Sequence, residues 1–378
     1  MDYHLTEDQA AIKELAERFT ADEISPNAAT WDSEQQFPRA TISTAGSLGF
    51  GAIYLDESLG GIGLNRIDAA IIFEAMAYGC PSTSAFISIH NMATWMIAKF
   101  GSHALKTKCL PKLMTLENIA SYALTEPDSG SDAAGLKSKA ERMADHYLVN
   151  GSKAFISGAG ENEVYVCMLR TADEAHRGIS CLVIDKDLPG VTFGALERKL
   201  GWHSQPTRAV IFDNVKVPLE NLVGEEGQGF AIAMSGLDGG RLNVGACSIG
   251  GAQRCLDEAV TYVKQRKQFG RPIAEFQNTQ FVLADMATEL AASRTLLHTA
   301  AQKIDEDAAD KTTYAAMAKL KATEAGSKIA NDALQLHGGY GYLMDYPVER
   351  FVRDLRVHQI LEGTSEIMRM VIGRNLVA

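Results

Sequence analysis

The feature of this sequence that most constrains its fold is the spacing of its apolar residues, which changes twice along the chain. Up to about residue 118 they recur every three or four positions, as one face of a helix requires. From 119 to 222 they form short runs, separated by Gly, Asp, Asn and Pro, that are typical of β-strands. From 223 to 378 the helical spacing returns. This order predicts an α+β multidomain chain: an N-terminal α-helical domain (1–118), a middle antiparallel β-barrel or sandwich (119–222) and a C-terminal helical domain (223–378).

Local signals predict where several helices begin and end. Thr6 and Gln9 have the spacing of a capping box, and Asn65 can cap the helix that follows it. Pro111 is expected to interrupt or shift a helix over 103–114, because its ring removes a backbone donor. The longest predicted helices span 229–265, 278–305 and 312–336.

Composition and charge exclude several classes of protein. Of the 378 residues, 46% are hydrophobic and 22% are charged, as in an ordinary globular protein. The net charge of -11 argues against general nucleic-acid binding, which needs a basic face. No apolar stretch of the sequence is long enough to predict a membrane span.

Cysteine usage and the N-terminal stretch bear on the compartment. Six cysteines lie scattered without a CxxC pair, which favours reduced thiols and no zinc site. The N-terminus resembles neither a secretory signal nor a transit peptide, so we expect a bacterial cytoplasm or, for a processed chain, a mitochondrial matrix. Walker, HEXXH and GxSxG motifs and a strand–GxGxxG–helix unit are missing from the sequence, so no metal is expected and metal-dependent or serine hydrolysis has no support.

The stretch 351–374 places one carboxylate, that of Glu362, between two apolar segments. Gly363 allows the backbone to turn after it, and Thr364 or Ser365 can cap the next helix. A carboxylate held among apolar groups has a raised pKa and suits proton abstraction. The pattern also fits a solvated loop glutamate, so the local sequence leaves both interpretations open.

Other short motifs each allow a binding role and an ordinary structural one. The loop 122–135 could place backbone N–H groups against a phosphate or a polar ring edge, or form a plain turn. Phe155 and Ser157 share one strand face, where they could hold a flat ring or lie in the core and at the edge.

Three motifs of the C-terminal third are equally open. Arg266–Gly270 could clamp a pyrophosphate or satisfy a helix C-terminus. The glycines of Gln335–Tyr342 permit a close backbone approach or a helix cap. Asp238 and Arg241 could bind a polar ligand or form a surface ion pair.

Taken in order, five separated segments resemble the acyl-CoA dehydrogenase family, and the resemblance covers essentially the whole chain. The segments are Tyr122–Asp132, Phe155–Ser157, Arg266–Gly270, Gln335–Gly341 and Ile360–Glu366. The resemblance implies a C-terminal four-helix bundle after the middle β domain, a homotetramer, and FAD bound between subunits.

The same resemblance assigns contacts residue by residue. The residues expected to contact FAD are Tyr122, Leu124, Thr125, Gly130, Ser131, Phe155, Ile156, Ser157, Arg266, Phe269, Phe276, Gln277, Gln335, Gly338, Gly339, Thr364 and Glu366. The residues expected to contact substrate or CoA are Ser131, Asp238, Arg241, Leu361 and Arg374. Those from Arg266 to Gly339 match positions that reach the FAD of a neighbouring subunit.

In the resemblance, Glu362 matches the catalytic base. It removes the α proton of the thioester while hydride passes from the β carbon to flavin N5, and a backbone N–H with a ribityl hydroxyl stabilises the enolate oxygen. Some members carry the base on another helix, directly before the position of Arg241. Here that residue is Gly240, which cannot serve, and this supports Glu362.

Four stretches also resemble family members that act on isobutyryl-CoA in valine breakdown, namely 82–92, 151–161, 201–212 and 357–368. Leu361 stands where straight-chain members often carry Tyr, which suits a branched acyl group or simply packing. The expected reaction converts isobutyryl-CoA to methacrylyl-CoA, with electron-transfer flavoprotein as acceptor. The alternatives are a short-chain or 2-methylbutyryl-CoA dehydrogenase, an acyl-CoA oxidase, and a non-catalytic acyl-CoA-binding protein.

Two positions depart from the family pattern. Asp128 stands where the family loop usually has Gly, which puts a negative charge near the expected cofactor. Phe155 replaces the Trp of many members, so stacking is kept while the indole N–H is lost.

Overall fold

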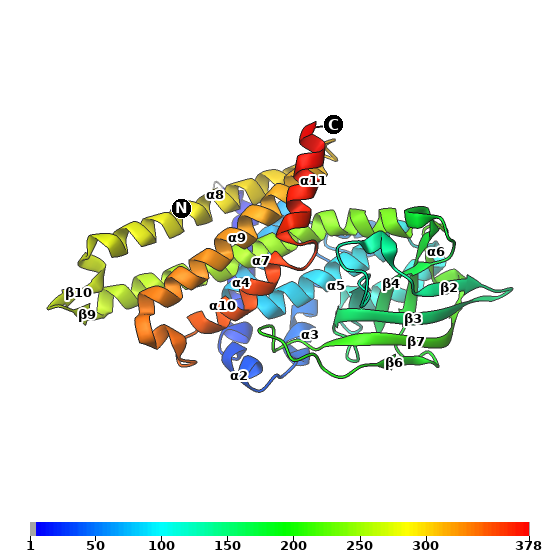
Figure 1. The fold of residues 1–378 in the computed structure, drawn as a ribbon, viewed down its shortest axis with the longest axis horizontal. Helices are drawn as coiled ribbons and strands as arrows, with labels where there is room; N and C mark the ends of the chain where they lie inside the picture. The colour runs from blue at the N-terminus through cyan, green and yellow to red at the C-terminus, as the bar shows by residue number, and fades with distance from the viewer. Residues whose placement is uncertain (1–4, 378) are drawn as a thin grey trace.

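The structure is a computed structural model that describes residues 5–377; Met1–His4, where the N-terminal stretch discussed above begins, and Ala378 lie outside the described residues. The molecule is elongated, with long helices at one end and a β-sheet at the other (Figure 1). The predicted helix–sheet–helix order is confirmed.

The N-terminal third is helical. Its elements are α1 (Glu7–Phe19), a π-helical turn (Thr20–Ile24), α2 (Ala28–Ser33), α3 (Arg39–Ser47), a 3-10 turn (Glu57–Leu59), α4 (Arg66–Gly79), α5 (Pro81–Phe100) and α6 (His103–Met114). The capping box of Thr6 with Gln9 and the cap at Asn65 are present as predicted. The interruption expected at Pro111 is wrong, because α6 runs through it. Pro111 lies in the last turn on an exposed face, where solvent can satisfy the carbonyl that loses its N–H donor.

The middle third forms one eight-stranded sheet. Its strands are β1 (Ala120–Ala123), β2 (Lys139–Arg142), β3 (His146–Ser157), β4 (Val164–Arg170), β5 (Ile179–Asp185), β6 (Val191–Phe193), β7 (Thr207–Pro218) and β8 (Leu222–Val223). The order is β6-β7-β3-β2-β4-β5-β8, with β1 paired to β4. Most pairs are antiparallel as expected, but β1 and β2 each run parallel to β4. The short strands β2 and β8 were not among the predicted runs.

The C-terminal third holds the longest helices, at the positions predicted. They are α7 (Gly229–Gln265), α8 (Gln277–Asp305) and α9 (Lys311–His337), followed by α10 (Val348–Arg356) and α11 (Ser365–Val377). A two-stranded hairpin, β9 (Lys267–Gln268) and β10 (Arg271–Pro272), caps the far end of the bundle. None of the helices described has an apolar stretch long enough to cross a membrane.

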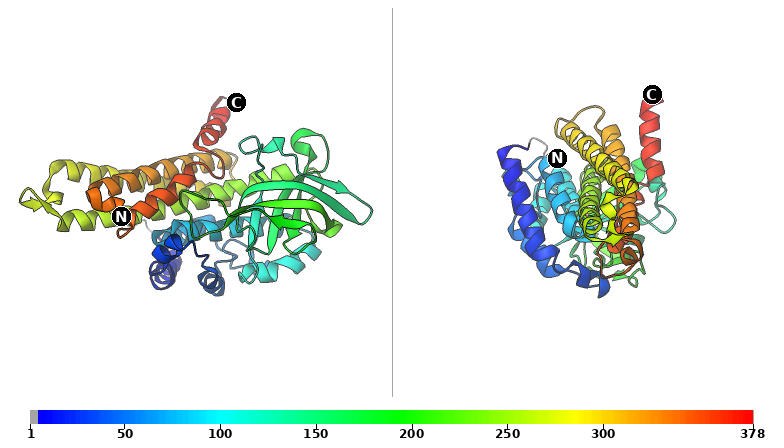
Figure 2. Two further views of the ribbon diagram at one scale, coloured as in Figure 1. Left: turned by 60° about the horizontal axis from the view of Figure 1, so that its bottom comes forward. Right: turned by 90° about the vertical axis from the view of Figure 1, so that its left-hand side faces the viewer.

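Buried contacts hold the parts together at the middle of the molecule. Helix α5 packs against both α7 and β1, and the ring of His90 on α5 accepts a hydrogen bond from the N–H of Ala120 at 2.9 Å. The N–H of Trp202, before β7, donates to the carboxylate of Asp354 on α10 at 2.6 Å. As the views of Figure 2 show, α11 projects from this body. The hydrogen bonds of His90 and Trp202 join the helical and β parts of the molecule where they meet.

Candidate active site

Glu362 lies on the short connection between a 3-10 turn (Val357–Gln359) and α11. Its backbone is left-handed, with φ of 53°, and Gly363 follows with φ of 94°. A left-handed conformation costs a non-glycine residue about 1–3 kcal/mol, so surrounding contacts must maintain it. The turn directs the Glu362 side chain inward, against α7.

Gly240 on α7 makes the space that the Glu362 carboxylate occupies. A Cβ atom at position 240 would lie 2.3 Å from Oε2 of Glu362 and 2.7 Å from the sulfur of Met92. Any larger residue at 240 would displace the carboxylate. Gly240, which cannot itself serve as a base, is thus the residue of α7 that makes room for the Glu362 carboxylate.

The Glu362 carboxylate has the electrostatics of a general base. Its Oε2 atom is buried and has no hydrogen-bond partner among the described residues. Burial raises the pKa of Glu362 to about 7, against the opposing effect of the positive charges of Lys319 and Arg241. A base with a pKa near neutrality is half ionised where the enzyme works and binds a proton strongly. The alternative of a solvated loop glutamate is excluded by this burial.

Helix α9 holds the connection on both sides of Glu362. The ammonium of Lys319 donates to the carbonyl of Gly363 at 2.8 Å. Glu324 accepts from the Gln359 side chain at 2.8 Å and from the Ser365 hydroxyl at 2.6 Å. Lys319 and Glu324 were not among the residues singled out from the sequence, because a lysine and a glutamate within a helical pattern carry no local signal.

Arg241 and Asp238 face the same region from α7. Arg241 is 5% exposed, and its guanidinium donates to Asp238 at 2.7 Å. The hydroxyl of Thr312 donates to the other oxygen of Asp238 at 2.6 Å. The surface-pair alternative is excluded for Arg241, whose Nε is buried without a partner among the described residues.

A second buried guanidinium, that of Arg66, was also missed by sequence reasoning. It lies 3.7 Å above the ring of Tyr54, and a Cβ at Gly239 would approach it at 2.6 Å. Its Nη1 is buried without a hydrogen-bond partner in the described chain. Neighbouring glycines of α7 therefore contact Arg66 and Glu362, respectively.

The two β-domain segments expected to hold the flavin are joined by a buried ion pair. Lys153 is 0% exposed and donates to Glu126 at 2.7 Å and to the carbonyl of Leu124 at 3.1 Å. The N–H of Ala154 donates to the carbonyl of Thr125 at 2.8 Å. The loop after β1 is thereby fixed against the end of β3.

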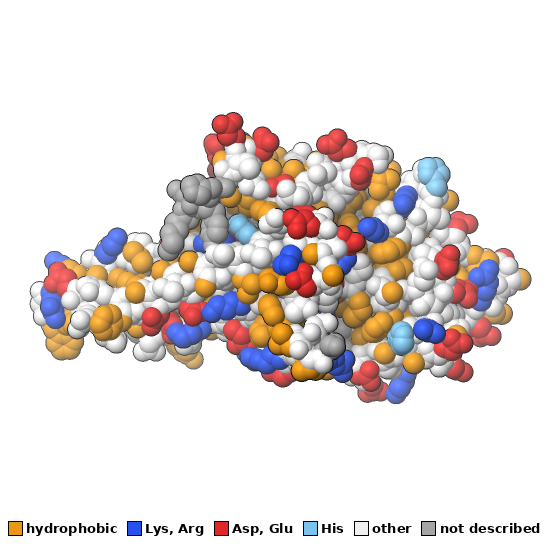
Figure 3. Space-filling view, turned by 90° about the horizontal axis from the view of Figure 1, so that it is seen from above, with side chains coloured by type: hydrophobic (Ala, Val, Ile, Leu, Met, Phe, Trp, Pro, Cys, Tyr) orange, Lys and Arg blue, Asp and Glu red, His pale blue; other side chains and the backbone are white. Residues whose placement is uncertain are grey.

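The side chains of these segments divide between surface and core. Phe155 is 65% exposed with φ of 59°, so the core alternative for its ring is excluded. Ser157 is partly exposed, whereas Ile156 is 3% exposed and packs in the core of the sheet, which leaves only its backbone for contact. The hydroxyl of Tyr122 is buried without a partner in the described chain. Figure 3 shows apolar side chains gathered where the helical and β parts of this face meet.

The remaining loop residues are more exposed. Gly130 and Ser131 lie at the surface, and a Cβ at Gly130 would meet nothing within 4 Å. Asp128 also points outward, with its carboxylate 3.7 Å from the ammonium of Lys137. The negative charge that departs from the family pattern is therefore directed to solvent and partly balanced.

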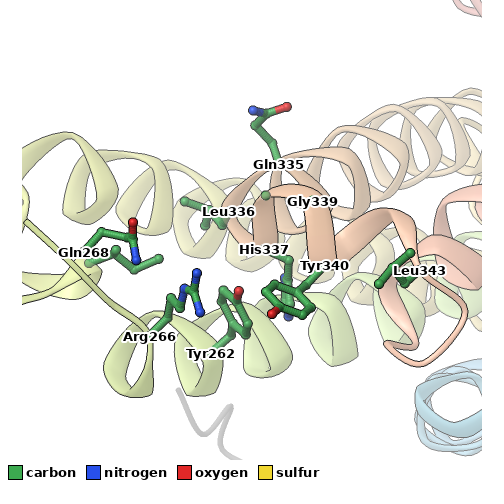
Figure 4. Close-up of a pocket in the computed structure, with 11 residues that line it drawn as sticks. Tyr262, Arg266, Gln268, Gln335, Leu336, His337, Gly339, Tyr340 and Leu343 are labelled. Carbon is green, nitrogen blue, oxygen red and sulfur yellow. The ribbon is translucent and has the colours of Figure 1, made fainter.

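A second group of expected contacts lies at the far end of the bundle. Arg266, Gln335, Gly338 and Gly339 line a cavity of about 490 Å³ beside Tyr340 (Figure 4). The neighbouring members are Phe269, which is 93% exposed at the hairpin, Phe276, over which the Arg271 guanidinium lies at 4.2 Å, and Gln277, the first residue of α8. Figure 1 places this hairpin at the end opposite the sheet, so one chain does not bring the two groups together.

The last expected residues lie on either side of Glu362 in the sequence. Leu361 packs at the edge of the helical core, and the Thr364 hydroxyl accepts the N–H of Ile367 at 3.3 Å, as its predicted cap role requires. Glu366 is exposed in the first turn of α11. Arg374 is exposed in the last turn of α11, the helix that projects from the body of the molecule.

The residues present fit FAD. An exposed aromatic face at Phe155, the unpartnered hydroxyl of Tyr122 and open glycine backbone at Gly130 match a flat ring with polar edges and a diphosphate tail. The cavity lined by Arg266 and Gly338 offers a cation and free backbone to a phosphate or a nucleotide.

Comparisons with known proteins agree with this geometry. Family models for the N-terminal, middle and C-terminal domains of acyl-CoA dehydrogenase match residues 6–117, 121–215 and 227–377. Mitochondrial isobutyryl-CoA dehydrogenase of Dictyostelium discoideum is 54% identical over 373 residues, which is 98% of this chain and 90% of that protein. The Bos taurus protein of the same name is 53% identical over 372 residues, 98% and 89% of the two chains.

Solved structures give the same result. Butyryl-CoA dehydrogenase from Megasphaera elsdenii has a TM-score of 0.97 and 36% identity, and the match covers 100% of both chains. PigA in complex with FAD and proline has a TM-score of 0.96 and 30% identity, covering 100% of this chain and 99% of that one.

Proposed function

This chain belongs to the acyl-CoA dehydrogenase family, and on that premise we propose that it converts isobutyryl-CoA to methacrylyl-CoA with FAD as cofactor. The observation that carries the proposal is the buried Oε2 atom of Glu362, which lies in the space left by Gly240 without a hydrogen-bond partner among the described residues. The relatives named isobutyryl-CoA dehydrogenase, which match nearly the whole chain, support the choice of acyl group.

In the proposed reaction Glu362 accepts the α proton of the thioester. Burial gives the carboxylate a pKa of about 7, high enough to hold that proton once it has moved. Gly240 and the turn at Gly363 keep the carboxylate in one place, which lowers the entropic part of the barrier. Bound FAD supplies the hydride acceptor, and Phe155, Ser157, Tyr122 and the loop to Ser131 are the residues of this chain that hold it.

Leu361 is proposed to shape the acyl pocket. It is an aliphatic side chain directly before the base, at the edge of the helical core. Asp238, Arg241 and Ser131 are proposed to contact the substrate or CoA, and Arg374 is proposed to contact CoA. A single methyl group in such a pocket changes discrimination by about 1–3 kcal/mol.

The assembly and the partners are further parts of the proposal. We propose a homotetramer of three-domain subunits (1–118, 119–222 and 223–378), in which the bundle end with Arg266, Phe269 and Gly338 contacts the FAD of a neighbour. The remaining expected contacts at that end are Phe276, Gln277, Gln335 and Gly339. Electron-transfer flavoprotein is the proposed acceptor. All six cysteines are free and buried, which fits a reducing compartment, either a bacterial cytoplasm or a mitochondrial matrix.

The test is anaerobic flavin bleaching with butyryl-, isobutyryl-, 2-methylbutyryl- and isovaleryl-CoA. We expect isobutyryl-CoA to reduce the flavin fastest, and Glu362→Gln to bind FAD normally while losing reduction by every substrate. A preference for butyryl-CoA would overturn the branched-chain assignment. Reduction of Glu362→Gln at the rate of the unmodified enzyme would overturn the assignment of the base.

A further inference from the structure

Lys319 on α9 is a buried cation whose surroundings set it apart from an ordinary core residue. It is 0% exposed, and the hydrogen bond that the structure gives its ammonium goes to a neutral group, the carbonyl of Gly363, at 2.8 Å. No carboxylate among the described residues forms a salt bridge with it. Burying an ammonium without a paired carboxylate is costly, whereas an apolar side chain of the same length would fill the space at no such cost.

The carbonyl that Lys319 holds belongs to the residue directly after the base. Glu362 and Gly363 are both left-handed, and the first of these conformations is strained. Rotation of the backbone at Gly363 would change how the turn that carries Glu362 is held against α9. The Lys319 hydrogen bond opposes that rotation, because it fixes the direction of the Gly363 carbonyl.

We propose that Lys319 is a positioning residue for proton abstraction: its ammonium holds the turn that keeps the Glu362 carboxylate against Gly240, and its charge favours the ionised carboxylate. This inference rests on the proposed function, since it concerns the base of that reaction. Lys319 would thus act through its charge as well as its hydrogen bond, whereas Glu324 on the same helix contacts Gln359 and Ser365 through hydrogen bonds.

The charges around Lys319 and Glu362 predict how the rate of proton abstraction depends on pH. Lys319 and Arg241 both lower the pKa of Glu362 from the value that burial alone would produce. Burial lowers the pKa of Lys319 itself to about 8, against the opposing effect of Glu362. Glu362 is therefore ionised, with Lys319 still charged, between about pH 7 and pH 8.

Between about pH 7 and pH 8, the other titratable groups around Lys319 and Glu362 are either neutral or charged neighbours of Lys319. Burial lowers the pKa of His358 to about 3, so its ring is neutral. Burial raises the pKa of Tyr54, Tyr122 and Cys247, and these groups stay protonated. The charged neighbours of Lys319 besides Glu362 are Arg241, Glu324 and Glu366.

The experiment measures the rate of flavin reduction by isobutyryl-CoA in the FAD-loaded enzyme, from mildly acidic to mildly alkaline pH. We expect Lys319→Met to lower the maximal rate about 10-fold or more, as misplacement of a base does. The midpoint of the rise in rate with pH should move upward, because loss of the cation makes Glu362 harder to ionise. Lys319→Arg should restore the midpoint, and KM should change little in all variants.

Two further variants separate charge from anchoring. Lys319→Gln keeps an N–H donor for the Gly363 carbonyl without the charge, so it should shift the midpoint upward even if Lys319→Met does not fold. Glu324→Gln retains Lys319 while weakening the loop, so it should lower the rate without an upward shift. Infrared difference spectra, with the Glu362 carboxyl band identified by its loss in Glu362→Gln, report the same ionisation without turnover.

The outcomes are distinguishable. Unchanged rate and midpoint in both Lys319→Met and Lys319→Gln would overturn the positioning role and leave the proposed function intact. An unmodified enzyme whose flavin is not reduced by any acyl-CoA would overturn the proposed function, and this inference with it.

Discussion

At the scale of single residues, the site depends on Gly240, which has no side chain and so leaves room for the side chain of Glu362. Gly240 contributes no atom to the chemistry, yet its lack of a Cβ is what lets the Glu362 carboxylate lie buried against α7. The atoms that an added Cβ would meet, the carboxylate and the Met92 sulfur, are ends of flexible side chains. Substitution there should therefore affect catalysis more than folding.

Gly240→Ala is predicted to keep the fold and to lower the flavin reduction rate by about 100-fold, because the carboxylate must shift by an ångström or more. Stopped-flow reduction and thermal unfolding measure the two effects. Gly245→Ala is the matched control on the same helix: its Cβ would meet a methyl group of Leu297 at 2.7 Å instead of the carboxylate. A Gly240→Ala rate equal to that of Gly245→Ala would contradict the prediction.

The raised pKa of Glu362 also predicts a pH effect on stability. A carboxyl whose pKa is about 7 when folded and near 4.5 when unfolded costs stability as pH rises between these values. The cost is fully present above about pH 7 and is on the order of 3 kcal/mol at most. Glu362→Gln should therefore raise Tm at alkaline pH, with a gain that fades towards pH 5. Equal gains at both pH values would contradict the assignment of the shift to Glu362.

At the scale of elements, the loop after β1, which we propose contacts FAD, is joined to β3 by one buried ion pair. Glu126 accepts from Lys153 and from the backbone N–H groups of Lys137 and Ser138, at 2.6–3.0 Å. These bonds join the segment after β1 to β2 and β3. We therefore expect a substitution at Glu126 or Lys153 to affect FAD binding through the backbone of both segments.

Lys153→Met is predicted to destabilise the protein by about 3–5 kcal/mol, because it leaves the Glu126 carboxylate buried without its cation. It should also weaken FAD retention, measured by flavin fluorescence after gel filtration. The double variant Glu126→Gln/Lys153→Met should recover part of the loss, and Lys139→Met, at an exposed position of β2, is the control. A Lys153→Met protein as stable as that control would contradict the prediction.

At the scale of the whole molecule, the two groups of expected FAD contacts lie at opposite ends of an elongated chain. The proposed homotetramer is the arrangement that would bring the bundle end of one subunit to the flavin loop of another. Phe269, which is 93% exposed at the hairpin, and α11, which projects from the body, are then surfaces for a neighbouring subunit. Contact with a neighbouring subunit would remove the apolar area of this ring from water.

Phe269→Ala is predicted to weaken assembly and FAD retention together, since burial of a phenylalanine contributes about 1.5–3 kcal/mol. Sedimentation velocity over a dilution series, with released flavin followed by fluorescence, measures both. Met143→Ala, which removes a 40% exposed side chain at the β2–β3 turn, is the control. Assembly and FAD retention identical to those of the control would contradict the proposed subunit contact.

Local chemistry explains what could be predicted without the structure. The capping box at Thr6 and the cap at Asn65 act within one helical turn, so the residues themselves report the boundaries. The helix–sheet–helix order follows from apolar spacing in the same way. Strands β2 and β8 were not predicted, because runs of two to four residues are too short to show a periodic pattern of apolar residues.

By itself, then, the sequence determined the order of helices and strands, several helix boundaries and the segment that carries Glu362. Only the tertiary structure decided that Oε2 of this carboxylate is buried and unpaired among the described residues, that Gly240 makes its space, and that Lys319 and Arg241 lie near it. The physical reason is distance along the chain. Propensity and capping act between neighbours in sequence, whereas burial and charge depend on which remote elements pack together.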